Sequence, residues 1–245
     1  HVRVRAECCI GLREEGIQVL DLTVGEPDFD TPDNVKAAGI AAIERGDTKY
    51  TAVNGTPTLR SAIKQRLLRH TGIAYSDAEI SVGSGAKHVI FTALMATLSP
   101  GDEVLIPAPY WVSYPDMVVV NDGVPVVVQC PIEDDFKLTP DALRAARTDR
   151  TRRLILNSPS NPTGAVYTDT ELAALGEVLD DFPHVLVLTD ENYDEVFLGT
   201  GRASSLVGAV PHLRDRILLV NGVSKTYAMT GWRLGYCAGP APLVA

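Results

Sequence analysis

Short apolar runs alternate with stretches of helical periodicity along the chain from residue 78 onward. The runs rich in Val, Ile and Leu predict strands at residues 79–82, 103–106, 125–129, 153–156, 185–188 and 215–220. Apolar side chains at helical spacing predict helices at residues 86–98, 112–119, 141–147 and 168–179. Strands of this kind separated by helices are typical of a mainly parallel sheet covered on both faces. The pattern therefore predicts an α/β fold.

The first part of the chain does not follow this alternation. It predicts a helix at residues 7–15, a short strand at 19–23 and an irregular turn at 25–29. We expect these residues to belong to a separate, smaller unit. The chain starts at His1 rather than Met and stops where a new helix could begin, so we expect it to be a fragment of a longer protein.

Composition and charge narrow the functional class. The chain has 245 residues, with 22 Lys and Arg against 31 Asp and Glu and a formal net charge of -9. This acidic balance, without a basic run, argues against nucleic-acid binding. The apolar runs are too short to cross a membrane, and no signal-peptide pattern opens the sequence, so we expect a cytoplasmic protein. The four cysteines have no zinc-type spacing, which predicts no metal site.

Polar or glycine-rich segments follow five of the predicted strands. They are residues 83–87, 109–111, 157–162, Asp190 and the pair Ser224 and Lys225. Ligands of open α/β sheets bind beyond the carboxyl ends of the strands. We therefore expect these segments to form one site.

The glycine-rich segment GSGAK at residues 83–87 leads into a predicted helix. Backbone N–H groups at such a helix start suit a single phosphate, although a plain glycine turn has the same sequence. His88 stands where a dinucleotide fingerprint needs its third glycine. A P-loop would need Ser or Thr after Lys87, so nucleotide binding is disfavoured.

Four further residues suggest an aromatic aldehyde cofactor. A desolvated Lys225 could form a Schiff base with an aldehyde, although most loop lysines are surface residues. Asp190 ends an apolar run, and a buried carboxylate there needs a cationic partner such as a protonated pyridine nitrogen, or serves as a helix cap. Tyr193 could present its hydroxyl to the same ligand, and Trp111 could stack on it or belong to the core.

Six stretches together make the sequence recognisable. They are TVGEPDF at 23–29, KYT at 49–51, PYWVSYP at 109–115, NPTG at 161–164, DENY at 190–193 and SKTYAMTGWR at 224–233. In these stretches the chain resembles the class I, fold-type I aminotransferases that use pyridoxal phosphate, and among them the bacterial aspartate subgroup. The resemblance implies a mixed seven-stranded sheet covered by helices on both faces. It also implies that residues 1–32 belong to a small domain, whose C-terminal part is absent, and residues 33–245 to the large cofactor domain.

The resemblance implies a role for each residue of the cofactor site. Lys225 matches the lysine that holds the cofactor and moves the substrate proton. Asp190 matches the acid that keeps the pyridine nitrogen protonated, and Tyr193 and Asn161 match the donors to the phenolic oxygen. Trp111 matches the aromatic residue over the ring, and the Asn161–Pro162 bond is expected to be cis.

The phosphate site follows from the same resemblance. Gly85, Ala86 and Arg233 match its donors, with Lys87 beside them. Tyr50 matches a tyrosine that reaches the phosphate of the neighbouring subunit, which implies a homodimer.

The substrates implied are an amino acid and a 2-oxo acid, with Gly25, Trp111 and Asn161 as contacts. Lys87 matches the lysine that receives the distal carboxylate of the substrate, which favours aspartate and glutamate, with prephenate as a further candidate. Lys87 could instead assist the phosphate site. The leading hypothesis is transamination between aspartate and 2-oxoglutarate. A β-lyase, a synthase, an oxidase or an inactive pyridoxal-phosphate-sensing domain remain alternatives.

Three positions depart from the family pattern. Asn192 stands where a small or aliphatic residue normally packs against the cofactor ring, so it could shift the electronics of the ring or turn away from it. Ser160 replaces the first of two asparagines, and Gly222 replaces a phosphate-binding serine of some relatives.

Overall fold

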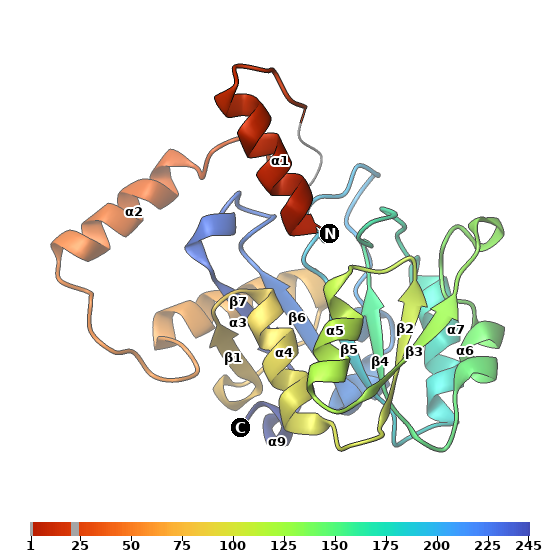
Figure 1. Cartoon of the computed structure of the whole chain (residues 1–245). Coiled ribbons are helices and arrows are strands. Elements are labelled where there is room, and N and C mark those ends of the chain that lie inside the picture. The colour runs from red at the N-terminus through yellow and green to blue at the C-terminus, as the bar shows by residue number, and fades with distance from the viewer. Residues whose placement is uncertain (1, 21–24) are drawn as a thin grey trace.

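A seven-stranded mixed sheet forms the centre of the molecule (Figure 1). This computed structural model describes residues 2–20 and 25–245. The strand order is β1-β7-β6-β5-β4-β2-β3. The strands are β1 Ile80–Gly83, β2 Glu103–Ala108, β3 Val124–Gln129, β4 Thr151–Asn157, β5 Leu186–Asp190, β6 Ile217–Gly222 and β7 Gly235–Ala238. The predicted α/β fold is confirmed.

Both faces of the sheet are covered because successive strand residues point to opposite faces. On β2, Val104 and Ile106 belong to one core cluster, while Leu105 belongs to the other. The first cluster includes side chains of α4 Ala86–Thr97 and α5 Ser113–Val120, which lie in front of the sheet in Figure 1. The predicted apolar runs of inner strands such as β2 and β6 are thus buried on two sides, whereas the edge strand β3 is largely exposed.

The second cluster lies on the opposite face of the sheet. It includes side chains of α3 Pro57–Thr71, α6 Pro140–Ala146, α7 Asp169–Asp180 and the short α8 Leu206–Ala209. The last helix, α9 Ala241–Val244, contacts β1 and completes the described elements after β7.

Local sequence fixes where most of these helices start. The Thr56 side chain accepts a hydrogen bond from Leu59 N at the start of α3, and Pro57 occupies the first turn. Thr168 and Glu171 form a capping box at the start of α7. By contrast, α4 begins after Gly85 without any side-chain cap, so its first amides stay available.

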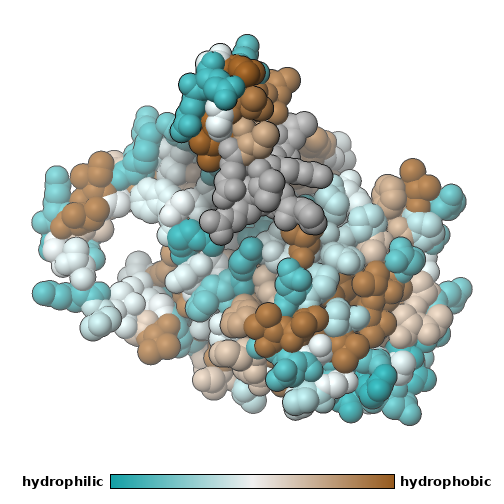
Figure 2. All heavy atoms as spheres, viewed as in Figure 1, coloured by the Kyte–Doolittle hydropathy of each residue, from teal (hydrophilic) through white to brown (hydrophobic). Residues whose placement is uncertain are grey.

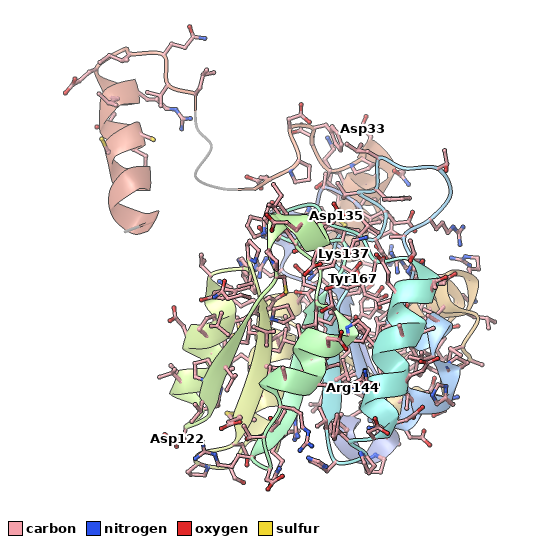
Figure 3. The ribbon with its side chains drawn as sticks, turned by 90° about the vertical axis from the view of Figure 1, so that its right-hand side faces the viewer. Asp33, Asp122, Asp135, Lys137, Arg144 and Tyr167 are labelled. Atoms are coloured by element: carbon pink, nitrogen blue, oxygen red, sulfur yellow. The ribbon has the colours of Figure 1, made fainter. Side chains whose placement is uncertain are left out.

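Strand β7 was not predicted, and it runs antiparallel to both neighbours, β1 and β6. The other neighbouring strands pair in parallel, so their carboxyl ends meet at one edge of the sheet. In Figure 3, Lys137 and Tyr167 lie toward this end of the sheet, whereas Asp122 lies at the opposite end. The loops at the carboxyl edge hold the predicted site residues.

The N-terminal helices lie apart from the sheet. Helix α1 Val2–Glu14 confirms the helix predicted at residues 7–15 and begins earlier than predicted. Helix α2 Asp33–Glu44 projects at the left of Figure 1. The predicted strand at 19–23 does not form at residues 19–20, which are irregular, and its remainder lies outside the described residues. A domain boundary near residue 32 stays a prediction.

None of the helices within residues 2–20 and 25–245 combines the length and apolar character needed to cross a membrane. Across the same ranges, no group of His, Cys, Asp and Glu side chains forms a candidate metal site.

Candidate active site

A cavity of about 910 Å³ opens at the carboxyl edge of the sheet. Its wall comes from the segments after β1, β2, β4, β5 and β6, together with the loop at Gly25. Nine predicted site residues line it: Gly25, Ala86, Lys87, Trp111, Asn161, Asp190, Tyr193, Lys225 and Arg233. The structure therefore brings most of the predicted site together.

Asp190 lines this cavity and is only 4% exposed to solvent. Tyr114 Oη donates to its Oδ2 at 2.7 Å, and the backbone N and Nδ2 of Asn192 donate to its Oδ1 at 3.2 and 3.0 Å. Burial raises the pKa of Asp190, while these donors act in the opposite direction by stabilising the carboxylate. The result is an oriented acid without a cationic partner among the described residues.

Tyr193 and Asn161 lie next to each other on the cavity wall. Asn161 Nδ2 donates to Tyr193 Oη at 3.2 Å, and burial raises the pKa of the tyrosine. The cis peptide bond between Asn161 and Pro162 is confirmed. Asn157 supports the loop, because its Oδ1 accepts from Asn161 N at 2.7 Å and its Nδ2 donates to Asp190 O at 2.8 Å.

Lys225 extends into the same cavity from the segment after β6. Its Nζ lies 5.7 Å from the centre of the Tyr193 ring and donates to the carbonyl oxygen of Gly25. Burial lowers the pKa of Lys225, and the negative charge of Glu26 opposes this. A lowered pKa increases the share of the neutral amine, which is the form that attacks an aldehyde.

The start of α4 forms a cradle for an anion. Gly85 has a positive φ of 93°, and a Cβ there would lie 2.3 Å from Arg233 Nη2. A Cβ on Gly235 would lie 2.3 Å from Ala86 N, so β7 approaches the helix start as closely as glycine allows. The exposed Arg233 donates to Thr230 O at 2.8 Å. Uncapped amides, the positive helix end and an arginine suit a phosphate group.

Trp111 and Lys87 form the side of the cavity next to this cradle. Lys87 Nζ lies 4.7 Å from the centre of a Trp111 ring, and Tyr114 meets that tryptophan edge-on at 5.3 Å between centroids. Trp111 thus packs edge-on against the tyrosine that donates to Asp190.

A buried ion pair holds the segment that carries Asp190 and Tyr193. Arg66 Nη2 donates to both carboxylate oxygens of Asp194, at 2.9 and 2.7 Å. Asn221 Nδ2 donates to Asp194 Oδ2 and to Glu191 O, both at 2.9 Å. These bonds anchor the loop after β5 to α3 and β6.

Comparison with known proteins decides the family. Residues 17–245 match the family described as aminotransferase class I and II. The chain belongs to this family. The aspartate/prephenate aminotransferase of Cereibacter sphaeroides is 53% identical over 233 residues, which cover 95% of this aminotransferase chain and 58% of the relative. The chain thus spans less than two thirds of the length of that relative.

Solved aminotransferase structures share the fold. The crystal structure of the aspartate aminotransferase from Rhizobium meliloti matches with a TM-score of 0.94 and 48% identity, over 99% of this chain and 60% of that one. The Thermus thermophilus aspartate aminotransferase with maleate matches with a TM-score of 0.92 and 40% identity, over 99% and 62%. The predicted family and aspartate subgroup are confirmed by these relatives.

Two predicted residues of the aminotransferase site do not line the cavity. Gly85 lies behind it and makes room for Arg233. Tyr50 is fully exposed on the segment after α2. The roles assigned to the individual site residues stay predictions.

Tyr114 and Gly235 were not predicted as site residues, and Asn157 was predicted only as part of the segment 157–162, without a role of its own. Tyr114 lies inside the recognised PYWVSYP stretch, which is the one signal that could have singled it out. Asn157 pairs with Asp190, and Gly235 with Gly83 and Gly222, through strand register. Register depends on contacts that are distant in sequence, so local patterns reveal neither the pairing of Asn157 with Asp190 nor the place of Gly235.

Proposed function

We propose that the protein containing this chain binds pyridoxal phosphate and transfers the amino group of aspartate to 2-oxoglutarate. One observation carries this proposal: a single cavity contains a desolvated lysine, a buried carboxylate and an anion cradle. Each feature has other uses, but together they match the aldehyde, the ring nitrogen and the phosphate of this cofactor.

The polar and aromatic residues of the cavity have the chemistry that the groups of pyridoxal phosphate require. Asp190 is a buried acid that lacks a cation and would gain one from a protonated ring nitrogen. The uncapped start of α4 and Arg233 offer donors to phosphate oxygens. Tyr193 and Asn161 offer donors to a phenolic oxygen, and Trp111 offers a ring for stacking.

Pyridoxal phosphate supplies an aldehyde that captures amines and a ring that withdraws electrons from the substrate α-carbon. Lys225 would hold this group through its Nζ and would also move the proton of the substrate α-carbon. Asp190 would hold the ring nitrogen in its protonated form, and Tyr114 and Asn192 keep this carboxylate in place. Burial lowers the pKa of Lys225, which favours the neutral amine that both roles require.

Lys87 supports the choice of a dicarboxylic substrate. Its Nζ lies on the cavity wall over Trp111, and no carboxylate of the described residues forms an ion pair with it. Relatives named for aspartate and prephenate, and the Thermus structure with the dicarboxylate maleate, favour the same class. We propose that Lys87 binds the distal carboxylate of aspartate.

A homodimer is the second part of the proposal. Helix α2 has no buried residue, and Ile40, Ile43, Tyr50 and Val53 are exposed on it and on the segment that follows. Figure 2 shows apolar side chains on this projecting segment. A second copy would cover them and receive Tyr50 beside its phosphate cradle. The cytoplasm remains the proposed compartment from sequence alone.

Borohydride trapping tests the cofactor site. The purified protein is incubated with pyridoxal phosphate, reduced, digested and mapped by mass spectrometry, with Lys225→Ala as the control. We expect the label on Lys225 of the parent and on no cavity residue of the variant. Label elsewhere, or none in folded protein, contradicts the proposal.

Product analysis tests the reaction. Aspartate and 2-oxoglutarate should give oxaloacetate and glutamate in equal amounts. Ammonia and pyruvate from aspartate would instead support a lyase, and bound cofactor without turnover would support a sensing domain.

A further inference from the structure

Asn192 interrupts the family pattern at the most buried part of the cavity. It lies two residues after Asp190 and directly before Tyr193, and its side chain lines the cavity. The side chain does not turn away from the site. It bonds to the acid that is expected to meet the cofactor ring.

The two oxygens of Asp190 have separate donors. Oδ2 accepts a hydrogen bond from the hydroxyl of Tyr114 on α5, and Oδ1 accepts from both the backbone N and the side-chain Nδ2 of Asn192. An aliphatic side chain at position 192 would leave only the backbone donor on Oδ1. Asn192 therefore adds a bond that the ordinary family residue cannot make.

The carbonyl oxygen of the Asn192 side chain shows how the amide is oriented and that this orientation is unfavourable for folding. Asn192 Oδ1 is buried and has no hydrogen-bond partner. A Cβ on Gly222 would lie 3.0 Å from this oxygen, so glycine at 222 leaves the room that Asn192 occupies. A buried unpaired carbonyl is unfavourable for folding. Such local conflicts occur where a residue serves the site rather than stability.

We propose that Asn192 is a positioning residue that, together with Tyr114, fixes the Asp190 carboxylate in its charged form and in the orientation that meets a protonated ring nitrogen. A direct ligand contact is a poorer account, because Nδ2 is used by Asp190 and Oδ1 is buried. The consequence for binding rests on the proposed function, whereas the effect on Asp190 does not.

The ionisable groups that face Asp190 come from two elements. Tyr114 lies on α5, and Glu191 and Tyr193 follow Asp190 in its own segment. Tyr114 is buried, which holds its pKa well above the usual range and keeps its proton available to Asp190. Glu191 opposes the charge on Asp190, so Asn192 is one of the few groups that favour it.

The first experiment follows Asp190 without cofactor. Carbon-13 NMR titration of cofactor-free protein is compared for the parent, Asn192→Leu and Asn192→Gln, with the resonance assigned through its loss in Asp190→Asn. Leucine keeps the volume and removes the donor, so the titration midpoint should rise. Glutamine keeps a donor and should restore part of the shift. Equal midpoints for the parent and Asn192→Leu would overturn the proposal.

The second experiment measures ring-nitrogen recognition. Dissociation constants are compared for pyridoxal 5′-phosphate and for its 1-deaza analogue, which has C–H in place of the ring nitrogen. The preference for the natural compound should fall about tenfold in Asn192→Leu, the factor expected for one hydrogen bond to a charged group. Asn121→Leu is the matched control, since Asn121 bonds to Met117 O and does not line the cavity.

Thermal unfolding separates positioning from a structural role. At a pH low enough to protonate Asp190, where the lost donor no longer stabilises a charge, cofactor-free Asn192→Leu should unfold at the same temperature as the parent or higher, because it loses a buried unpaired oxygen. A lower unfolding temperature together with an unchanged ligand preference would show a structural role only. If no variant and no parent binds either compound, the proposed function fails, while the titration still decides the role of Asn192.

Discussion

Asp190 is a carboxylate whose charge the fold disfavours. Burial disfavours its charge, and its donors only partly compensate, so the folded chain raises its pKa above the ordinary value. Folded protein then binds this proton more tightly than unfolded protein does. The associated stability is fully present at low pH and is lost as the pH rises through the raised pKa. A bound cation on the carboxylate would reverse this loss.

Replacement of Asp190 by asparagine should therefore change the pH dependence of unfolding. Without cofactor, the free energy of unfolding of the parent should fall relative to Asp190→Asn between about pH 4 and neutral pH, because only the parent buries a new charge. Urea titrations at several pH values measure the difference. Parallel pH profiles would show that Asp190 is not forced to ionise in a buried position.

Lys87 allows a test of substrate choice at one side chain. Lys87→Met keeps the length and removes the charge. It should raise KM for aspartate about tenfold and leave a monocarboxylic donor such as alanine unaffected, because only aspartate loses an ion pair. Steady-state kinetics with both donors measure this, and Lys64→Met, outside the cavity and paired with Asp77, is the control. Equal losses for both donors would place Lys87 at the phosphate instead.

At the scale of elements, prediction succeeded where local pattern and burial agree. The apolar stretch of β2, with Val104 and Ile106 on one face and Leu105 on the other, identified a doubly covered strand. The sequence pattern did not predict strand β7, because its four residues begin with Gly235 and pair antiparallel between β1 and β6. The polar strand ends predicted the site, but the bond from Tyr114 to Asp190 depends on how α5 meets β5, which is distant from it in the sequence.

The contact between β7 and α4 should be intolerant of any side chain. Gly235→Ala would place a Cβ 2.3 Å from Ala86 N, and backbone cannot move aside as a flexible side chain can. We expect a loss of about 3 kcal/mol in the free energy of unfolding and weaker binding of inorganic phosphate at the start of α4. Gly11→Ala on α1, where nothing lies within 4 Å, is the control and should be neutral or stabilising. Equal stability of the two variants would contradict the close approach.

The whole molecule is incomplete as a single copy if the proposed dimer is correct. The cavity has its lysine, acid and cradle, but Tyr50 points elsewhere on an exposed segment. No residue of helix α2 is fully buried within its own chain. Isologous dimers place the same residue of each subunit against the other, so two shared sites are expected.

Mixing two inactive variants tests whether the sites are shared. Lys225→Ala removes the amine of its own cavity, and Tyr50→Glu should repel the phosphate in the cavity of its neighbour. A mixed dimer would contain one site with intact Lys225 and Tyr50, so a randomly exchanged equal mixture should recover about a quarter of the parental activity. Co-purification of tagged and untagged subunits verifies exchange, and each variant alone sets the background. If verified exchange leaves activity at that background, Tyr50 serves its own chain or none, and the shared site must be abandoned.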